Sequence, residues 1–514
     1  MKKNVFYLSI LVFTAVIFSS CKPTINPIPE YVVSVEATLN KNAPALQSFS
    51  HATNGNEWLL FAGRTNQEND NGGLHDMTAN SDYAEESFPP LSFNEYLYVY
   101  NPTTDAIPTS ITIDNMLEVI VEKFPTYSLD SLTKYQAAFR NTNALVKQVN
   151  EYLIVVGGYG PKNFTTDKKD YITYNHVVKI HVPSLIALIK KDYDNVNEKE
   201  LFAFGQNKSL VSTGGEMHYI GNDTISKGTF YLVGGHNFGG TAANGQKYVD
   251  AVYPFSISTN KTTHTLSISL DTPISDVSDP NGITSDDTSI FRRRDGPITP
   301  SLYFNSLENS LEESIAIYAG VFKPGEDLEA WNDAIYVHPN YAGSNSRLYT
   351  YDSSYNQKNF NVYSCPSLVA YDADTKTLHT FLLGGIGDGN TKKEKRLSGF
   401  TNTGTHIKLN VDKNPLKSSS SQFSMNLFSN ENTNQKPFYG AEAIFFPTTG
   451  FKSTSIAKDI IDIKSNFAKN SNVSVGYIFG GIEAFDSHPG TYGRTKSRAS
   501  NKIWKVNFMK QTID

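Results

Sequence analysis

The chain has 514 residues and a formal net charge of −6 at pH 7, with 51 acidic residues against 45 lysines and arginines. A chain of this length buries a large core on its own, and its negative charge makes nucleic acid and anionic lipid surfaces unfavourable partners. Its two cysteines exclude a disulfide-rich scaffold, while 31 phenylalanines, 29 tyrosines and few helical patterns favour the all-β class.

The first predicted element is an export signal. Residues 1–20 combine two lysines with an apolar run from Val5 to Phe18 and two serines, a pattern typical of a secretory signal and not of a membrane span. The stretch that ends at Cys21 resembles a bacterial lipobox, with Phe18 where leucine is usual, and this implies cleavage before Cys21 and acylation of its thiol. The alternative is an ordinary signal with an incidental cysteine. We therefore expect lipid anchoring in the cell envelope, at the outer membrane, with a periplasmic or an exterior orientation both open.

A short spacer is expected to follow the anchor. Residues 21–29 contain three prolines and little to bury, so they predict an extended segment. Removal of the signal takes away two lysines and no acids, which moves the net charge to about −8. The remaining part, residues 30–514, has no run approaching about 18 apolar residues. We therefore expect it to contact the membrane only through the lipid.

Residues 30–514 contain a sixfold repeat. A β-rich run that ends in small residues recurs, and its last residue is Gly63, Gly158, Gly235, Gly320, Gly385 or Gly481, preceded in four runs by Gly157, Gly234, Gly384 or Gly480. After a polar loop, an alternating strand led by Asn or Asp follows at 94–99, 175–180, 250–255, 332–337 and 501–506, while 405–410 in the fifth unit keeps only the alternation. The glycines fit a tight bend with a positive φ that a side chain would penalise.

This pairing of strands resembles the kelch repeat, in which strand two ends in a glycine doublet and strand three leads into a turn. The resemblance covers residues from about 45 to 510 and implies a six-bladed kelch-type β-propeller of the galactose oxidase superfamily. The alternative is another all-β repeat or a pair of sandwiches. The last unit ends after strand three, whereas 30–36 alternates before the first unit. We expect this N-terminal strand to complete the last blade and close the ring.

Two connections carry apolar residues at helical spacing. Residues 114–124 and 456–467 therefore predict short helices that pack on the sheets. The serine-rich stretch 417–422 predicts a flexible loop instead.

The loops after strand two and before strand one are expected on one face of such a fold, where ligands usually bind. These loops are rich in aromatic, amide and histidine side chains, which suit sugars or peptides, although exposed loops are often of this composition. The residues singled out there are His75, Tyr159, His236, Phe238, Trp331, His488 and Tyr492. The favoured function is a non-catalytic module that binds a protein or glycan partner at this face.

Charged residues on the predicted inner strands form a second candidate site. Glu216, His218, Arg140 and Glu442 draw notice because charges seldom point into a narrow channel unless they are paired or used. Water-linked channel lining is their commoner role. Kelch-type sialic acid mutarotases use channel acids, histidines and arginines on an anionic sugar. The alternative function is therefore an enzyme of that type, with Glu216 or Glu442 as the base and Arg140 as the carboxylate partner.

Other inner positions have less specific interpretations. His51 falls on another inner strand, and the run 292–295 fits either the channel lining or a solvated turn. Galactose oxidase needs a cysteine linked to a tyrosine among its copper ligands. The only cysteine after the anchor, Cys365, begins an apolar stretch where a buried, inert thiol is expected. No Tyr-His dipeptide and no zinc-type spacing occurs, so we expect neither a cofactor nor a metal.

Overall fold

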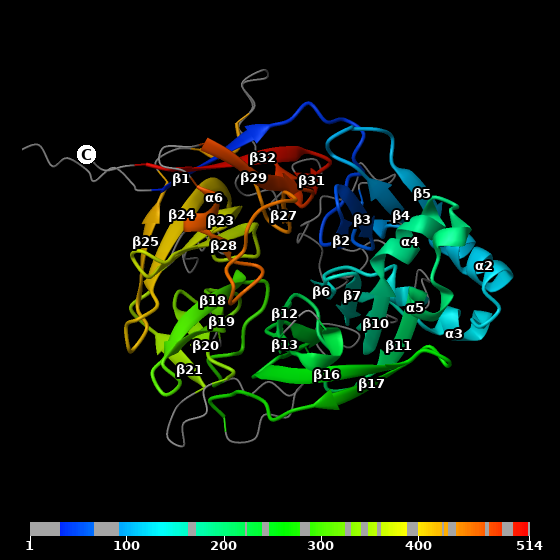
Figure 1. Cartoon of the computed structure of the whole chain (residues 1–514), viewed down its shortest axis with the longest axis horizontal. Coiled ribbons are helices and arrows are strands. Elements are labelled where there is room, and N and C mark those ends of the chain that lie inside the picture. Colours follow the sequence, from blue (N-terminus) through cyan, green and yellow to red (C-terminus); the bar gives the residue numbers. More distant parts are fainter. Residues whose placement is uncertain are drawn as a thin grey trace, which may run out of the picture.

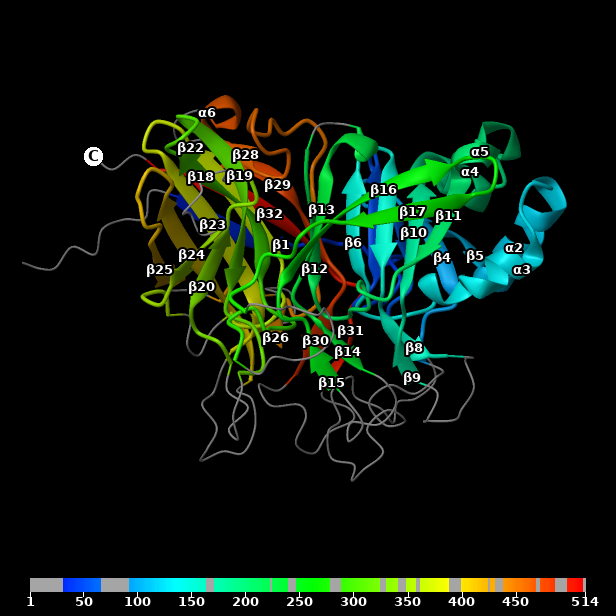
Figure 2. The same ribbon diagram turned by 90° about the horizontal axis from the view of Figure 1, so that it is seen from below.

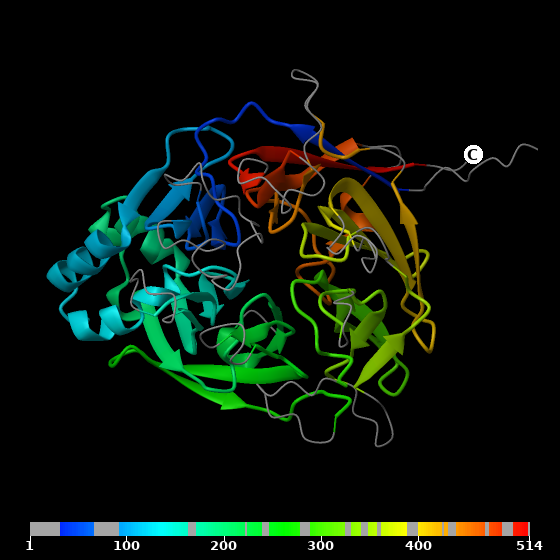
Figure 3. The ribbon, with the colours of Figure 1, turned by 180° about the vertical axis from the view of Figure 1, so that it is seen from behind.

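The computed structural model consists mainly of antiparallel β-strands. It describes residues 31–65, 92–162, 171–221, 224–238, 246–277, 288–323, 330–340, 348–356, 361–387, 399–423, 426–429, 438–467, 472–485 and 497–511. Seen from the front and from behind, its sheets surround a common central axis (Figures 1 and 3). The expected all-β class is confirmed. The anchor region, including Cys21 and Glu30, lies outside the described residues.

The described strands form meanders of four, which we call units one to six. Unit one comprises β2 (Ser50–Asn54), β3 (Glu57–Phe61), β4 (Tyr96–Tyr100) and β5 (Thr109–Thr112). Unit two comprises β6 (Leu145–Val149), β7 (Tyr152–Val156), β10 (His176–His181) and β11 (Phe202–Gln206). Unit three comprises β12 (Glu216–Ile220), β13 (Thr229–Val233), β16 (Val252–Asn260) and β17 (Thr265–Leu270).

The second half of the chain repeats this arrangement. Unit four comprises β18 (Ile298–Asn305), β19 (Ser310–Tyr318), β20 (Ala334–Val337) and β21 (Tyr349–Asp352). Unit five comprises β22 (Ser367–Asp372), β23 (Thr377–Ile386), β24 (Phe400–Asn410) and β25 (Ser418–Gln422). Unit six comprises β27 (Ile444–Pro447), β29 (Asn472–Phe479), β32 (Ile503–Lys510) and β1 (Tyr31–Ala37).

The predicted strand pairs are present in every unit. Each glycine-ended run is a second strand, and each alternating run is the third strand that pairs with it. All ten predicted glycines have a positive φ. Units two and three belong to one eight-stranded sheet, because the outer strands β11 and β17 meet in a single parallel pair, Phe204 with Thr265.

The last unit joins both ends of the described chain. Strand β1 pairs antiparallel with β32, from Tyr31 opposite Lys510 to Ala37 opposite Trp504. The expectation that the N-terminal strand completes the last unit is confirmed. Alternate residues of β1 are buried, which is the pattern of a strand with one face on a core.

Each pair of consecutive units shares a hydrophobic core. Cores lie between units one and two, two and three, three and four, four and five, and five and six. A further core joins unit six to unit one, where Trp58 stacks on Phe446 with ring centroids 4.1 Å apart. The units therefore bury their faces against one another and not against a separate layer.

Helices cover the outside of units one and two (Figure 1). They are α2 (Ile113–Lys123), α3 (Leu129–Lys134), α4 (Val182–Ile189) and α5 (Glu198–Leu201), with three-residue 3₁₀ turns at Gln136–Ala138 and Tyr193–Asn195. A further 3₁₀ turn, Ile225–Lys227, connects β12 and β13 of unit three. Helix α2 confirms the prediction for 114–124. In the described part of the chain, no helix combines the length and the apolar character needed to cross a membrane.

One local prediction is wrong, and another is confirmed only in part. The serine-rich stretch forms strand β25, which pairs with β24, because backbone groups can extend a sheet edge whatever the side chains are. The connection at 456–467 does contain a short helix, but it is limited to α6 (Ile463–Asn466). The preceding β28 (Ile461–Asp462) instead pairs in parallel with β22 of unit five. This connection of unit six therefore crosses onto the inner strand of its neighbour.

Short strands extend several units on one side of the molecule. They are β8 (Tyr159–Pro161), β9 (Tyr171–Thr173), β14 (His236–Phe238), β15 (Gln246–Tyr248), β26 (Phe438–Tyr439), β30 (Ile482–Ala484) and β31 (Ser497–Ala499). Figure 2 shows all of them at the same side of the ring. The segments after strand two therefore reach a common face, as the sequence predicts.

Candidate functional site

A ring of hydrogen bonds, five of them between backbone groups, surrounds the axis just before the first strands. Its members, which we call the neck, are Ser48, Asn143, Gly214, Asp295, Ser364 and Glu442. Each N–H from Asn143 onward donates to the carbonyl of the preceding member, at 3.1, 3.1, 2.7, 2.5 and 3.2 Å. A side chain bridges the remaining step, because Ser48 Oγ donates to Glu442 Oε2 at 3.0 Å. The neck thus links all six units.

The neck residues line one end of a cavity of about 640 Å³. The first strand of every unit, β2, β6, β12, β18, β22 and β27, contributes to its wall. Part of the connection between β27 and β29, including Ser453, Lys458 and Asp459, lines it as well. Ile461 and Asp462 of that connection pair with Ala370 and Tyr371, near the end of β22 that lies away from the neck. The connection therefore narrows the other end of the cavity.

Three of the four predicted candidates meet in this wall. Glu216 and His218 lie on β12, and Glu442 belongs to the neck. Burial raises the pKa of Glu216 to about 7, although Lys147 opposes the shift. Burial, with the charge of Asp295 next in importance, raises the pKa of Glu442 to about 8. Both carboxyls can hold or release a proton near neutral pH.

Glu442 is held by a chain of polar contacts. Its Oε2 accepts from Ser48 Oγ at 3.0 Å and from Asn143 Nδ2 at 3.1 Å. The amide nitrogen of Gln47 donates to Ser48 Oγ at 2.6 Å, and its oxygen accepts from Arg64 Nε at 2.6 Å and Nη2 at 2.8 Å. Arg64 is only 2% exposed. The Glu442 carboxyl is therefore fixed at the neck and backed by a buried cation.

The run 292–295 is not a solvated turn. Arg293 is 2% exposed, lies 2.6 Å from Asp333 through Nη2 and Oδ1, and stacks over Trp331. Asp295 Oδ2 accepts from Tyr363 Oη at 3.0 Å and lies 3.4 Å from Arg294 Nη1. Burial raises the pKa of Asp295. Arg293 of this run therefore stabilises unit four through Asp333 and Trp331. Of the four residues, only Asp295 lines the cavity.

The end of the cavity away from the neck holds further titratable groups. Lys147 Nζ forms an ion pair with Asp459 Oδ2. Burial acts to raise the pKa of Asp459, but the Lys147 ammonium outweighs it and holds that pKa below its ordinary value. Burial, followed by the Lys147 charge, lowers the pKa of His218 to about 3. Burial, followed by the charge of Asp459, raises the pKa of Glu313 to about 7.

Arg140 does not belong to this site. It precedes β6 and pairs with Glu95 Oε1 through Nη2, and it does not line the cavity. The prediction that it lies on an inner strand is wrong, because the chain turns at Gln136–Ala138 and reaches the axis only at Asn143. His51, by contrast, does line the cavity, and burial lowers its pKa to about 4.

The predicted loop residues are spread over the face that bears the short strands. His236 Nε2 lies 3.2 Å from Arg294 Nη1, and Phe238 packs with Tyr159 in an aromatic cluster. Trp331 is buried beneath Arg293. His75, His488 and Tyr492 lie outside the described residues.

Cys365 lies two residues before β22 and lines the cavity. Burial raises the pKa of its thiol to about 12, so it remains a protonated, unreactive thiol at neutral pH. Within the described residues, no three histidine, cysteine or acidic side chains are grouped so that they could hold a metal ion.

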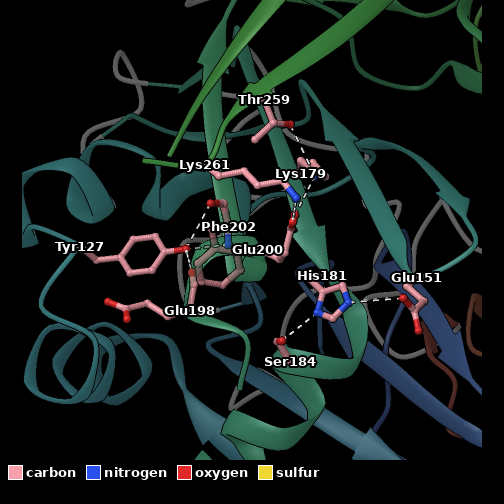
Figure 4. Close-up of polar contacts among 10 residues, drawn as sticks. All are labelled: Tyr127, Glu151, Lys179, His181, Ser184, Glu198, Glu200, Phe202, Thr259 and Lys261. Carbon is pink, nitrogen blue, oxygen red and sulfur yellow. Dashed lines mark hydrogen bonds and ion pairs between the residues drawn. The ribbon is translucent and has the colours of Figure 1, made fainter. Parts of the chain in front are cut away.

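A serine, a histidine and a glutamate lie in line on the outer side of unit two (Figure 4). His181 Nδ1 lies 2.7 Å from Ser184 Oγ, and its Nε2 lies 3.7 Å from Glu151 Oε2. Ser184 is 0% exposed, and its Oγ also accepts from Asn197 N at 2.9 Å. No substrate can reach this hydroxyl, so the group stabilises α4 and is not a nucleophile.

Several residues of the cavity escaped the sequence analysis. Lys147, Glu313 and Asp459 belong to units two, four and six, and nothing in the sequence marks them as neighbours. Ser48 and Asn143 could have been predicted, because each lies two residues before the first strand of its unit, as Glu442 does.

Comparison with protein-family models and with curated proteins gives no match. Among solved structures, one titled "Structure of YjhT" is similar over 92% of this chain and 100% of that chain, at 11% sequence identity and a TM-score of 0.42. A similarity of this size identifies neither a ligand nor a reaction.

Proposed function

We propose that this chain is a lipid-anchored, six-bladed kelch-type β-propeller of the cell envelope that binds a small polar ligand in its central cavity. The observation that carries the proposal is that the first strands of all units line one cavity of about 640 Å³. This volume lies in the range of sites for small ligands. A protein or glycan partner at the face with the short strands is compatible with the same function.

The propeller proposal is supported by three features. Four-stranded meanders follow one another around an axis, each shares a core with the next, and the N-terminal strand completes the last meander. The repeated glycines end the second strands with a positive φ.

The anchor proposal rests on the signal-like N-terminus and Cys21. We expect Cys21→Ser to release the protein from the membrane fraction or to leave its signal uncleaved. Fractionation with mass spectrometry of the N-terminus measures this. An unchanged membrane fraction in the variant would exclude the anchor.

Binding can be tested with the purified propeller and a panel of amines, neutral sugars and sugar acids. A ligand of the cavity should raise the melting temperature, and Glu216→Gln should reduce that rise. Glu118→Gln, on the exposed face of α2, is the matched control. If no member of the panel raises the melting temperature, the cavity-binding proposal falls.

A second candidate is an enzyme that exchanges a proton on a sugar, as in mutarotation. The pKa values of about 7 for Glu216 and about 8 for Glu442 favour it, because a general acid or base is most effective near its own pKa. Arg140, expected to hold a sugar carboxylate, does not line the cavity. Anomer exchange followed by NMR discriminates the two functions. If the protein accelerates anomer exchange and Glu216→Gln abolishes that acceleration, the protein is an enzyme and not only a binding module.

A further inference from the structure

Carboxyls outnumber ammonium groups in the described cavity wall. The carboxyls are Glu216, Asp295, Glu313, Glu442 and Asp459, and the ammonium groups are Lys147 and Lys458. Lys147 is committed to Asp459, and the nearest guanidinium groups face Asp295 and Gln47. The wall therefore presents acidic oxygens without an equal number of cations.

Two of these carboxyls have no protein partner. Among the described residues, the side-chain carboxyls of Glu216 and Glu313 make no hydrogen bond and no ion pair, although both residues line the cavity. Burial is the largest cause of the raised pKa of each, about 7 in both cases. Both side chains are half-buried, and a cation that enters the cavity would favour their ionised form.

Aromatic residues line the same cavity as the acids. Phe49, Tyr219, Phe445, Phe446 and Phe451 all line the cavity. Aromatic faces attract organic ammonium groups through their negative quadrupole. A bare divalent metal ion needs several oxygen ligands at one point, and the described residues offer no such group.

We propose that the cavity binds an organic ammonium ligand, whose protonated amine lies beside Glu216 and Glu442 toward the neck and whose carbon skeleton lies against the aromatic rings. This inference deepens the proposed function and rests on it. An anionic sugar fits the wall poorly, because its carboxylate would face the unpaired acids.

Binding should be linked to proton release. A bound cation favours the ionised form of each acid, so acids that hold protons in the empty cavity lose them when the ligand enters. Lys147 faces Glu216, and Asp459 with Lys147 faces Glu313. Around Glu442 the charged neighbours are Asp295, Glu216 and Arg64, and Tyr363 also faces it. The acids outnumber the cations here, and they lose their protons between pH 6 and pH 8. The affinity of the cavity for the ammonium ligand should therefore increase over this range.

The test compares ligands that differ only in charge. Isothermal titration of the full-length mature protein with 1,4-diaminobutane and 1,4-butanediol, and with glucosamine and glucose, is run in two buffers of different ionisation enthalpy. We expect each amine to bind about tenfold or more tightly than its neutral match, with proton release, since a charge-assisted contact contributes this much. Glu216→Gln should remove most of the preference, whereas Glu118→Gln should keep it.

The outcomes separate this inference from the function beneath it. Equal binding of amine and neutral match, Glu216-dependent binding of a sugar acid, or binding of Ca²⁺ alone would overturn the ammonium ligand and leave cavity binding standing. Absence of binding by every compound, including sugar acids and Ca²⁺, would overturn both.

Discussion

Single glycines mark the places where the backbone of one unit touches the next. Gly157 has a φ of +67°, and a Cβ there would lie 2.0 Å from the carbonyl oxygen of Ser212, at the start of unit three. Gly55 has a similar φ of +60° but nothing within 4 Å of its would-be Cβ. A substitution at Gly55 therefore measures the energetic cost of the positive φ alone, whereas one at Gly157 adds the steric clash with Ser212.

We expect Gly157→Ala to lower the free energy of unfolding by more than about 3 kcal/mol, because it adds a collision between units to the strained φ. Gly55→Ala should cost only about 1–2 kcal/mol, the cost of a left-handed φ alone. Urea unfolding of both variants measures this. Similar losses would show that contact between the units is not the main constraint.

Adjacent arginines provide a second matched pair. Arg293 is buried against Asp333, whereas Arg292 is half-buried, stacks on Tyr248 and donates to the carbonyl of Phe322. We expect Arg293→Ala to cost about 3–5 kcal/mol, because it leaves the buried Asp333 carboxylate without its cation, and Arg292→Ala about 1 kcal/mol. Thermal unfolding compares them. A larger loss for Arg292→Ala would contradict this assignment of the buried ion pair.

The cavity acids make stability depend on pH. The pKa values of Glu216 and Glu442, about 7 and about 8 in the folded chain, exceed the ordinary 4.5. The folded state therefore holds more protons, and its stability falls as the pH rises from about 5 to about 8. His51 and His218, with lowered pKa values, act in the opposite sense below about 6.5. Between about 6.5 and 8 the acids dominate.

We expect Glu216→Gln to raise the free energy of unfolding at pH 8 by about 1–3 kcal/mol, because the amide has no proton to lose. At pH 5 the change should be small, since the native carboxyl is already protonated. Denaturant titrations at the two pH values measure it, with Glu118→Gln as control. Equal effects at pH 5 and pH 8 would exclude a raised pKa at Glu216.

Only part of the candidate site could be predicted residue by residue. Glu216 and His218 could be predicted because they are titratable residues on a predicted inner strand, where such groups are seldom found unless they are paired or used. The Lys147–Asp459 pair could not be found, since the two are 312 residues apart and neither stands out locally. Arg140 was misplaced because the length of the turn before β6 could not be read from its composition.

At the scale of elements, the glycine-ended strands were predictable and the helices less so. A short apolar run followed by glycines occurs once per unit, so each instance supports the others. Helix α4 has nearly every side chain buried, and a short apolar run of this kind cannot be distinguished from a buried strand by periodicity. The loop prediction at β25 failed because edge pairing uses the backbone, not the serine side chains.

Strand β1 allows a test of the junction in unit six. Val33 is 2% exposed in the core shared by units five and six, while Glu36 is exposed on the same strand. We expect Val33→Asp to cost about 4 kcal/mol or more, because it buries an unpaired carboxylate. Glu36→Ala should change stability by no more than about 0.5 kcal/mol. A tolerated Val33→Asp, measured by melting temperature, would refute the packing of β1.

At the scale of the whole molecule, the repeat predicted the number and order of the units but not how they share contacts. The core between units six and one, the ring of the neck and the crossing of β28 onto unit five all join segments far apart in the chain. Such contacts follow from the closure of the ring and have no local signature. The cavity itself is one of them.

The pairing of Tyr31 with Lys510 also sets an order of events during synthesis. Strand β1 is synthesised early but can pair only with β32, so the sixth unit cannot be completed until residues 503–510 have left the ribosome. Contacts this distant in sequence are slow to form because loop closure costs entropy. A chain crossing a membrane from its N-terminal end would therefore keep an open, unlocked ring throughout transport. The pairing of β1 with β32 would close the ring only after residues up to Lys510 have crossed the membrane.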